Sequence, residues 1–221
     1  FERFWLPRIA SANPGLRVVR IDEGIAKIPM AGHDRDGASR PRRPQPAAQE
    51  IRTGHGHGGE SPDPHVWLSP ALVKIQAARI RDALAAVDQA HGLTYHSRYD
   101  GFVREIDELD AELKQRFAGR QGERFMAFHP SWGYFARDYG LVQIPVEFEG
   151  KEPKPARLQS LVRQARENGI QTVFVQPQFS AKSAELLSRE IGGKVVSADP
   201  LAEDWAANLR EVARKFGAAA R

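Results

Sequence analysis

Apolar residues recur at helical spacing in two long segments in the first half of the chain. Ser69 followed by Pro70 is typical of a helix start, with serine as the N-cap and proline in the first turn, and apolar positions continue to Val87. A second stripe advances in steps of three or four residues: Tyr95, Tyr99, Phe102, Ile106, Leu109, Leu113 and Phe117. This spacing predicts a helix over residues 93–118, whose stripe would run for roughly 34 Å at about 1.5 Å per residue.

The second half of the chain shows a different pattern, in which short apolar runs alternate with amphipathic segments. The runs predict strands at 125–128, 142–146, 172–175 and 194–197, and the segments between and after them predict helices at 158–165, 181–191 and 204–216. Strands that alternate with helices form parallel sheets with helices on both faces. Ligands of such sheets bind outside the carboxyl ends of the strands, so chemistry is expected there.

The beginning of the chain is less regular. Residues 1–12 read as the end of a helix that stops at Asn13-Pro14, and residues 16–21 alternate between apolar and polar and predict a strand. Residues 33–60 are rich in proline and glycine and have almost no large apolar side chains, which predicts a mobile loop. This loop carries three histidines, His33, His55 and His57.

Composition and charge exclude several classes of function. The 221 residues include no cysteine, which rules out disulfides, cysteine-based zinc sites, iron–sulfur clusters and thiol nucleophiles. No apolar run reaches the length of about 18 residues that a membrane-spanning helix needs. The 32 basic residues exceed the 28 acidic ones by only four, and the basic cluster at 40–43 has no interleaved aromatic residues. We therefore expect no nucleic-acid partner.

Three short motifs place metal-binding side chains where a parallel sheet would bind a ligand. His65 lies just ahead of a predicted helix, whereas His129 and Asp199 each follow a predicted strand. Imidazole nitrogen and carboxylate oxygen suit zinc, although on chemistry alone manganese or copper would also fit. Taken singly, each residue also fits a structural role, such as the cap of a turn at Asp199-Pro200.

Five motifs, in order along the chain, extend this set: residues 63–70, 129–141, 149–155, 173–180 and 195–201. In these motifs the sequence resembles the zinc-binding receptors of bacterial ABC importers, the ZnuA-like branch of a cluster that also contains manganese receptors. The resemblance implies an α/β fold of two lobes with parallel sheets, joined by one long rigid helix, with the metal between the lobes. Residues 1–92 would form an incomplete N-terminal lobe, residues 93–118 the helix, and residues 119–221 the C-terminal lobe.

The resemblance also implies a ligand set. His65 would come from the N-terminal lobe and His129 and Asp199 from the C-terminal lobe, with Asp63 and Ser131 as groups that orient the ligands. Manganese receptors usually have glutamate where this chain has His129, which favours zinc over manganese. The histidines of the 33–60 loop (His33, His55 and His57) would form a weak auxiliary scavenging or sensing site, or belong to an ordinary loop.

The function implied is that of a non-catalytic, monomeric receptor. It would capture zinc in the periplasm, or at the outer surface of a Gram-positive cell while anchored to the membrane, and deliver it to an ABC permease. In the family the first strands and a first ligand histidine precede the segment that Phe1–Trp5 resembles, so we expect a chain that lacks them and keeps three ligands. A zinc hydrolase is an alternative, because catalytic zinc has three protein ligands and an open position, but no His-Glu-x-x-His motif is present. A second alternative function is that of an adhesin or scaffold related to the metal receptors.

Overall fold

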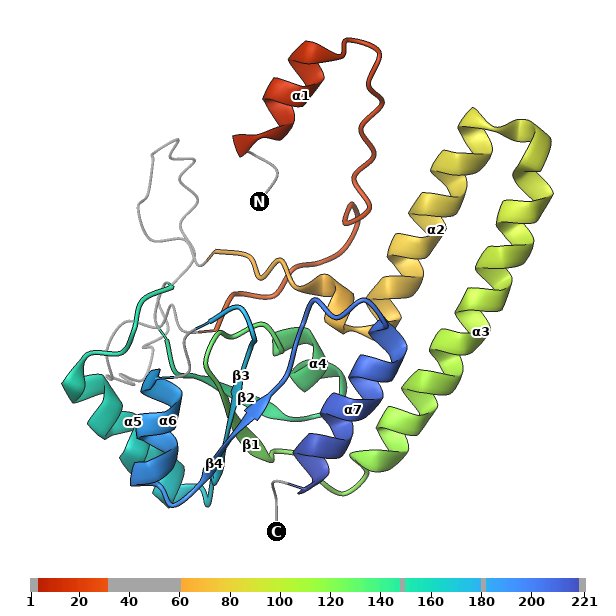
Figure 1. The fold of residues 1–221 in the computed structure, drawn as a ribbon. Helices are drawn as coiled ribbons and strands as arrows, with labels where there is room; N and C mark the ends of the chain where they lie inside the picture. Colours follow the sequence, from red (N-terminus) through yellow and green to blue (C-terminus); the bar gives the residue numbers. More distant parts are fainter. Residues whose placement is uncertain (1–3, 32–60, 148–149, 180–181, 219–221) are drawn as a thin grey trace, which may run out of the picture.

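The computed structural model describes residues 4–31, 61–147, 150–179 and 182–218, and its centre is a four-stranded sheet (Figure 1). The strands are β1 (Arg124–Ala127), β2 (Val142–Pro145), β3 (Thr172–Val175) and β4 (Lys194–Ser197). They pair in the order β2-β1-β3-β4, and every pairing is parallel. The α/β alternation predicted for the second half of the chain is therefore confirmed, with each strand at the expected place.

Helices cover both faces of this sheet. One face packs against α5 (Pro155–Glu167) and α6 (Lys182–Glu190), whose apolar residues contact Met126, Ile144 and Val173. The other face packs against α4 (Gly133–Asp138), α7 (Trp205–Ala218) and the end of α3 (Gly92–Arg116). Because successive side chains of a strand point to opposite faces of the sheet, Phe125 packs in one of these layers and Met126 in the other. The central strand β3 is buried at all four positions, as expected for an inner parallel strand.

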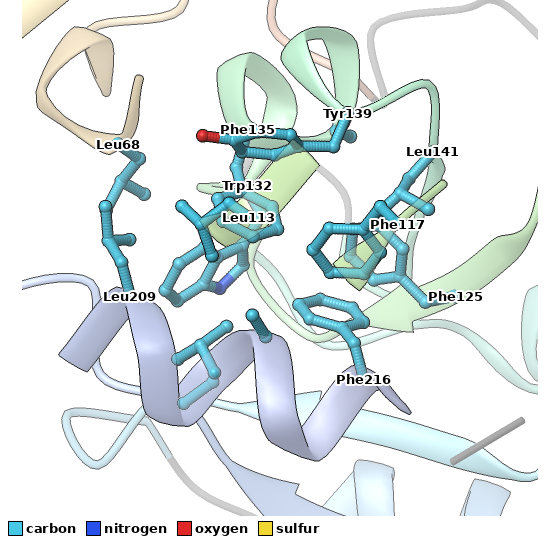
Figure 2. Packing of buried hydrophobic residues seen from close by; sticks show 14 of the residues in the cluster. Leu68, Leu113, Phe117, Phe125, Trp132, Phe135, Tyr139, Leu141, Leu209 and Phe216 are labelled. Carbon is cyan, nitrogen blue, oxygen red and sulfur yellow. The ribbon is translucent and has the colours of Figure 1, made fainter. Parts of the chain in front are cut away.

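The layer beneath α7 is an aromatic cluster (Figure 2). Phe216 of α7 lies between the sheet and α4, with ring centroids 4.1 Å from Phe174 and 5.9 Å from Phe135. Phe117, just after α3, meets Phe135 edge to face at 5.7 Å. Edge-to-face and offset rings at these separations add to the stability that burial alone provides. The cluster thus fixes α3, α4 and α7 on one side of the sheet.

The predicted long helix exists and pairs with its predecessor. α2 (Pro70–Val87) and α3 form an antiparallel hairpin joined by the short helix η3 (Gln89–His91) (Figure 1). The side chain of Ser69 accepts a hydrogen bond from Leu72 N at 3.2 Å, which is the N-cap expected from the sequence. The buried residues of α3 are confined to its second half, from Ile106 to Leu113. No helix in the described ranges is both long and apolar enough to cross a bilayer.

The prediction of a strand at residues 16–21 is wrong. These residues are described and have no strand structure, and Leu16, Val18 and Val19 are exposed. Alternation predicts a strand only where a neighbouring strand accepts its backbone hydrogen bonds, and the described residues offer none to this segment. The helix expected at residues 1–12 is present as α1 (Leu6–Ala12). The histidine loop, with His33, His55 and His57, lies outside the described residues.

Tyr139, next to α4, should make stability depend on alkaline pH. Burial, followed by the negative charge of Asp110, raises the pKa of its phenol above the ordinary value of 10.0, and the hydroxyl donates to Asp110 at 3.0 Å. Because the folded state favours the neutral phenol, this contribution is complete below about pH 10 and is lost as the pH rises towards the raised value.

We therefore expect Tyr139→Phe to cost about 1 kcal/mol of unfolding free energy at pH 8, and less at pH 11, in urea titrations at both pH values. Tyr99→Phe, at a partly exposed position on α3, is the control. A difference between wild type and Tyr139→Phe that is the same at both pH values would contradict this account.

Candidate metal centre

His65 lies directly before the short helix η2 (Val66–Leu68), which leads into α2. Asp63 folds back on it: Asp63 Oδ1 accepts from the His65 backbone N at 2.9 Å and lies 2.7 Å from the ring nitrogen Nδ1. Both residues are buried. A carboxylate can only accept, so in a neutral imidazole the proton is on Nδ1 and Nε2 keeps its lone pair for a metal.

His129 follows β1 and has the same kind of partner. Its Nδ1 pairs with Glu147 Oε1 immediately beyond β2, and the Glu147 side chain is only 3% exposed. The ring stacks on Phe179 with centroids 5.2 Å apart and planes 16° apart. The His65 and His129 rings are side by side, with centroids 5.2 Å apart and planes at 73°. Each of these two adjacent imidazoles therefore has a carboxylate partner on Nδ1.

Asp199 follows β4 at the same edge of the sheet, since the strands are parallel. Its Oδ1 accepts from Leu201 N at 2.9 Å and from Gln178 Nε2 at 3.0 Å, which ties the segments after β3 and β4 together. In the part of the chain that the structure describes, no three histidine, aspartate or glutamate side chains are grouped to hold a metal ion. His65 and His129 are brought together, and the set of three ligands stays a prediction.

The two residues expected to orient the ligands differ in their contacts. Asp63 contacts His65 directly, as described above. Ser131 is buried, and its Oγ accepts from Gln176 Nε2 at 2.6 Å while its backbone N donates to His129 O at 2.9 Å. Ser131 thus supports the turn that carries His129. Its hydroxyl is hydrogen-bonded to Gln176, which follows β3, instead of to the imidazole.

Glu147 is the residue of this centre that the sequence analysis missed. It comes directly after the predicted strand at 142–146, and the carboxyl ends of parallel strands meet at one edge of the sheet. The rule that selected His129 and Asp199 would therefore also have selected Glu147.

Hydrogen bonds from the second half of the chain hold in place the turn that carries His65 (residues 63–68, the His65 turn). Tyr134 donates to Asp63 O at 2.9 Å. The indole of Trp67 donates to Pro200 O at 2.8 Å, and the indole of Trp205 donates to Trp67 O at 2.7 Å. These bonds connect the turn to α4, to the segment after β4 and to α7. The position of His65 beside His129 is thus fixed by contacts within the described residues.

The chain is similar in sequence and fold to known zinc-uptake proteins. A crystal structure of ZnuA superposes on the whole chain with a TM-score of 0.85 and 39% sequence identity, and 76% of that structure is covered. A ZnuA deletion mutant with zinc bound matches 99% of the chain at 38% identity and a TM-score of 0.83, with 75% of the mutant covered. The high-affinity zinc uptake system protein ZnuA of Bacillus subtilis is 29% identical over 134 residues, or 60% of the chain.

The chain spans 42% of the length of that Bacillus relative. The structures that it matches are two-lobe binding proteins, of which it covers a part. The family model described as zinc-uptake complex component A, periplasmic, matches residues 1–219. The chain therefore belongs to this family, whose members are solute-binding receptors for zinc uptake and not enzymes.

Proposed function

We propose that this chain captures zinc as the metal-binding part of an extracytoplasmic receptor. The observation that carries the proposal is the pair of adjacent imidazoles, His65 and His129, each with Nδ1 held by a buried or nearly buried carboxylate. Carboxylate–histidine pairs of this kind are typical of metal ligands, because they fix the ring and raise the basicity of Nε2. The ZnuA relatives named above, one of them with zinc bound, support zinc as the metal.

Zinc is favoured over manganese by the ligand chemistry. Two neutral imidazoles suit zinc, whereas manganese prefers oxygen ligands. Asp199 remains our third proposed ligand, because it follows β4 at the edge where His129 follows β1. The auxiliary role of His33, His55 and His57 stays a prediction.

The description of the family supports a proposal for the fate of the captured zinc. We propose that the receptor acts in the periplasm, or at the outer surface of a Gram-positive cell, and delivers zinc as a monomer to the membrane permease of an ABC importer. The periplasmic description of the family supports the compartment. Because zinc is the cargo, the site must both bind it and release it at the permease.

Isothermal calorimetry with the whole chain at pH 7.5 tests the proposal. We expect zinc to bind in a 1:1 ratio and to displace manganese in competition, with protons released wherever a ligand must lose one. The absence of zinc binding, or a preference for manganese, would overturn the proposal.

Glu147 should matter for zinc affinity although it need not touch the metal. Glu147→Gln replaces the charged partner of His129 Nδ1 by a weaker acceptor, so the ring becomes a poorer ligand. We expect zinc affinity to fall by about 10- to 100-fold, the usual effect of losing such a partner. Competition titration with a chromophoric zinc chelator measures this change. Glu167→Gln, at the exposed end of α5, is the matched control; equal affinities in the two variants would rule out this role.

A further inference from the structure

Two buried polar atoms beside the His65 turn lack a hydrogen-bond partner among the described residues. They are Asp63 Oδ2, an acceptor, and Gln143 Nε2, a donor. Both lie around Gly133, the first residue of α4: a Cβ on this glycine would be 2.8 Å from Asp63 Oδ2 and 3.8 Å from Gln143 Nε2. An acceptor and a donor therefore lie near the same point beside Gly133, with Ile28 Cδ1 as a third neighbour at 3.3 Å from that Cβ.

The orientation of the Gln143 amide is set by its other end. Gln143 Oε1 accepts from Trp132 N at 2.8 Å. A backbone N–H requires an acceptor, so the oxygen must face Trp132 and the NH₂ group must face away from it. Asp63 is constrained in the same way, because its Oδ1 holds His65 and only Oδ2 is left for Gln143.

We propose that Gln143 and Gly133 are positioning residues for the zinc ligand His65. The Gln143 amide donates to Asp63 Oδ2 in a hydrogen bond mediated by one water molecule, since no direct hydrogen bond joins the two atoms. This bond would satisfy two buried groups that are costly to leave unpaired. It would also fix the Asp63 carboxylate, which in turn holds His65 with its proton on Nδ1 and Nε2 free. The inference rests on the proposed function for its link to zinc.

Gly133 is suited to a substitution test because its backbone does not require glycine. It is absent from the glycines with positive φ, and it begins a helix, where alanine is favourable. Any effect of Gly133→Ala should therefore come from the added Cβ, whose nearest neighbour would be Asp63 Oδ2 at 2.8 Å.

The first test replaces the donor and keeps the acceptor. Gln143→Glu retains an oxygen for Trp132 N but presents a carboxylate to Asp63, and Gln115→Glu, at an exposed position on α3, is the charge-matched control. The ring nitrogens of His65 are followed by ¹⁵N NMR in the metal-free protein at pH 8, and zinc affinity by chelator competition. We expect Gln143→Glu to lower the fraction of His65 with the proton on Nδ1 and to weaken zinc binding by about tenfold or more, with Gln115→Glu unchanged.

The second test adds the Cβ. Gly133→Ala should shift the His65 ring and weaken zinc binding in the same direction as Gln143→Glu. Gly101→Ala, in the middle of α3 with only the end of the Arg104 side chain within 4 Å, should do neither. A His65 ring that is unchanged in both variants overturns the proposal, even if zinc affinity falls, because the loss would then be an effect of charge or packing. The NMR measurement needs no metal, so it decides the positioning role even if the wild-type chain fails to bind zinc.

Discussion

Replacement of His129 by alanine is expected to abolish tight zinc binding. The substitution removes one of two adjacent imidazoles and leaves the nearly buried carboxylate of Glu147 without its partner. Loss of a hydrogen-bond partner of a metal ligand lowers metal affinity by about 10- to 100-fold. Loss of the ligand itself should therefore lower zinc affinity by more than about 100-fold. The same result is expected for His65→Ala, which leaves Asp63 without the ring that it holds.

Chelator competition at pH 7.5 measures both variants against His96→Ala, a histidine on the exposed side of α3. His96→Ala should keep the affinity of the wild type. The ring of His129 is partly exposed and lies at the edge of the sheet, so we expect His129→Ala to fold. Circular dichroism checks that both variants are folded. Wild-type affinity in either His65→Ala or His129→Ala would mean that zinc is bound elsewhere.

Phe135→Ala is expected to lower the free energy of unfolding by about 3–5 kcal/mol, the usual cost of truncating a buried phenylalanine. Phe135 on α4 is fully buried. Its ring centroid lies 5.7 Å from Phe117, 4.8 Å from Tyr139 and 5.9 Å from Phe216 (Figure 2). These neighbours belong to or adjoin three different helices, so they cannot all close over the space that the ring leaves.

Urea titration followed by circular dichroism measures this loss. Phe4→Ala is the matched control, since Phe4 is 88% exposed and its truncation should change stability by less than about 0.5 kcal/mol. A small effect at Phe135 would show that the aromatic cluster rearranges to fill the space, contrary to the close packing of α3, α4 and α7 on the sheet.

The second half of the fold could be predicted because each strand is a short apolar run between turn signals. Gly169, with a positive φ of 64°, and Gly192, with a φ of 65°, end helices just before β3 and β4 and mark those boundaries in the sequence. The segment at 16–21 has an equally regular pattern but no partner strand in the described residues, and a local pattern carries no information about a partner. α4 was missed because its six residues are too few for a helical repeat to be visible.

The arrangement of the candidate metal centre could be predicted only in part. The positions of His65, His129 and Asp199 at the ends of elements can be read from the sequence, and so could that of Glu147. The pairing of each imidazole with a carboxylate depends on where separate turns meet. The direction of the Gln143 amide depends on the backbone N–H of Trp132, a contact between residues on different elements. Such contacts are set by the tertiary packing, which no local spacing encodes.

The hydrogen bonds of the two indoles give the chain an intrinsic optical reporter. Trp67 and Trp205 donate to backbone oxygens around the turns that carry His65 and Asp199, so a shift of either turn changes the environment of an indole. Trp5, just before α1, is 48% exposed and takes part in neither hydrogen bond, so its signal should stay constant as the turns move. If the proposed uptake and release of zinc move either turn, tryptophan fluorescence would time that movement without any label attached to the protein.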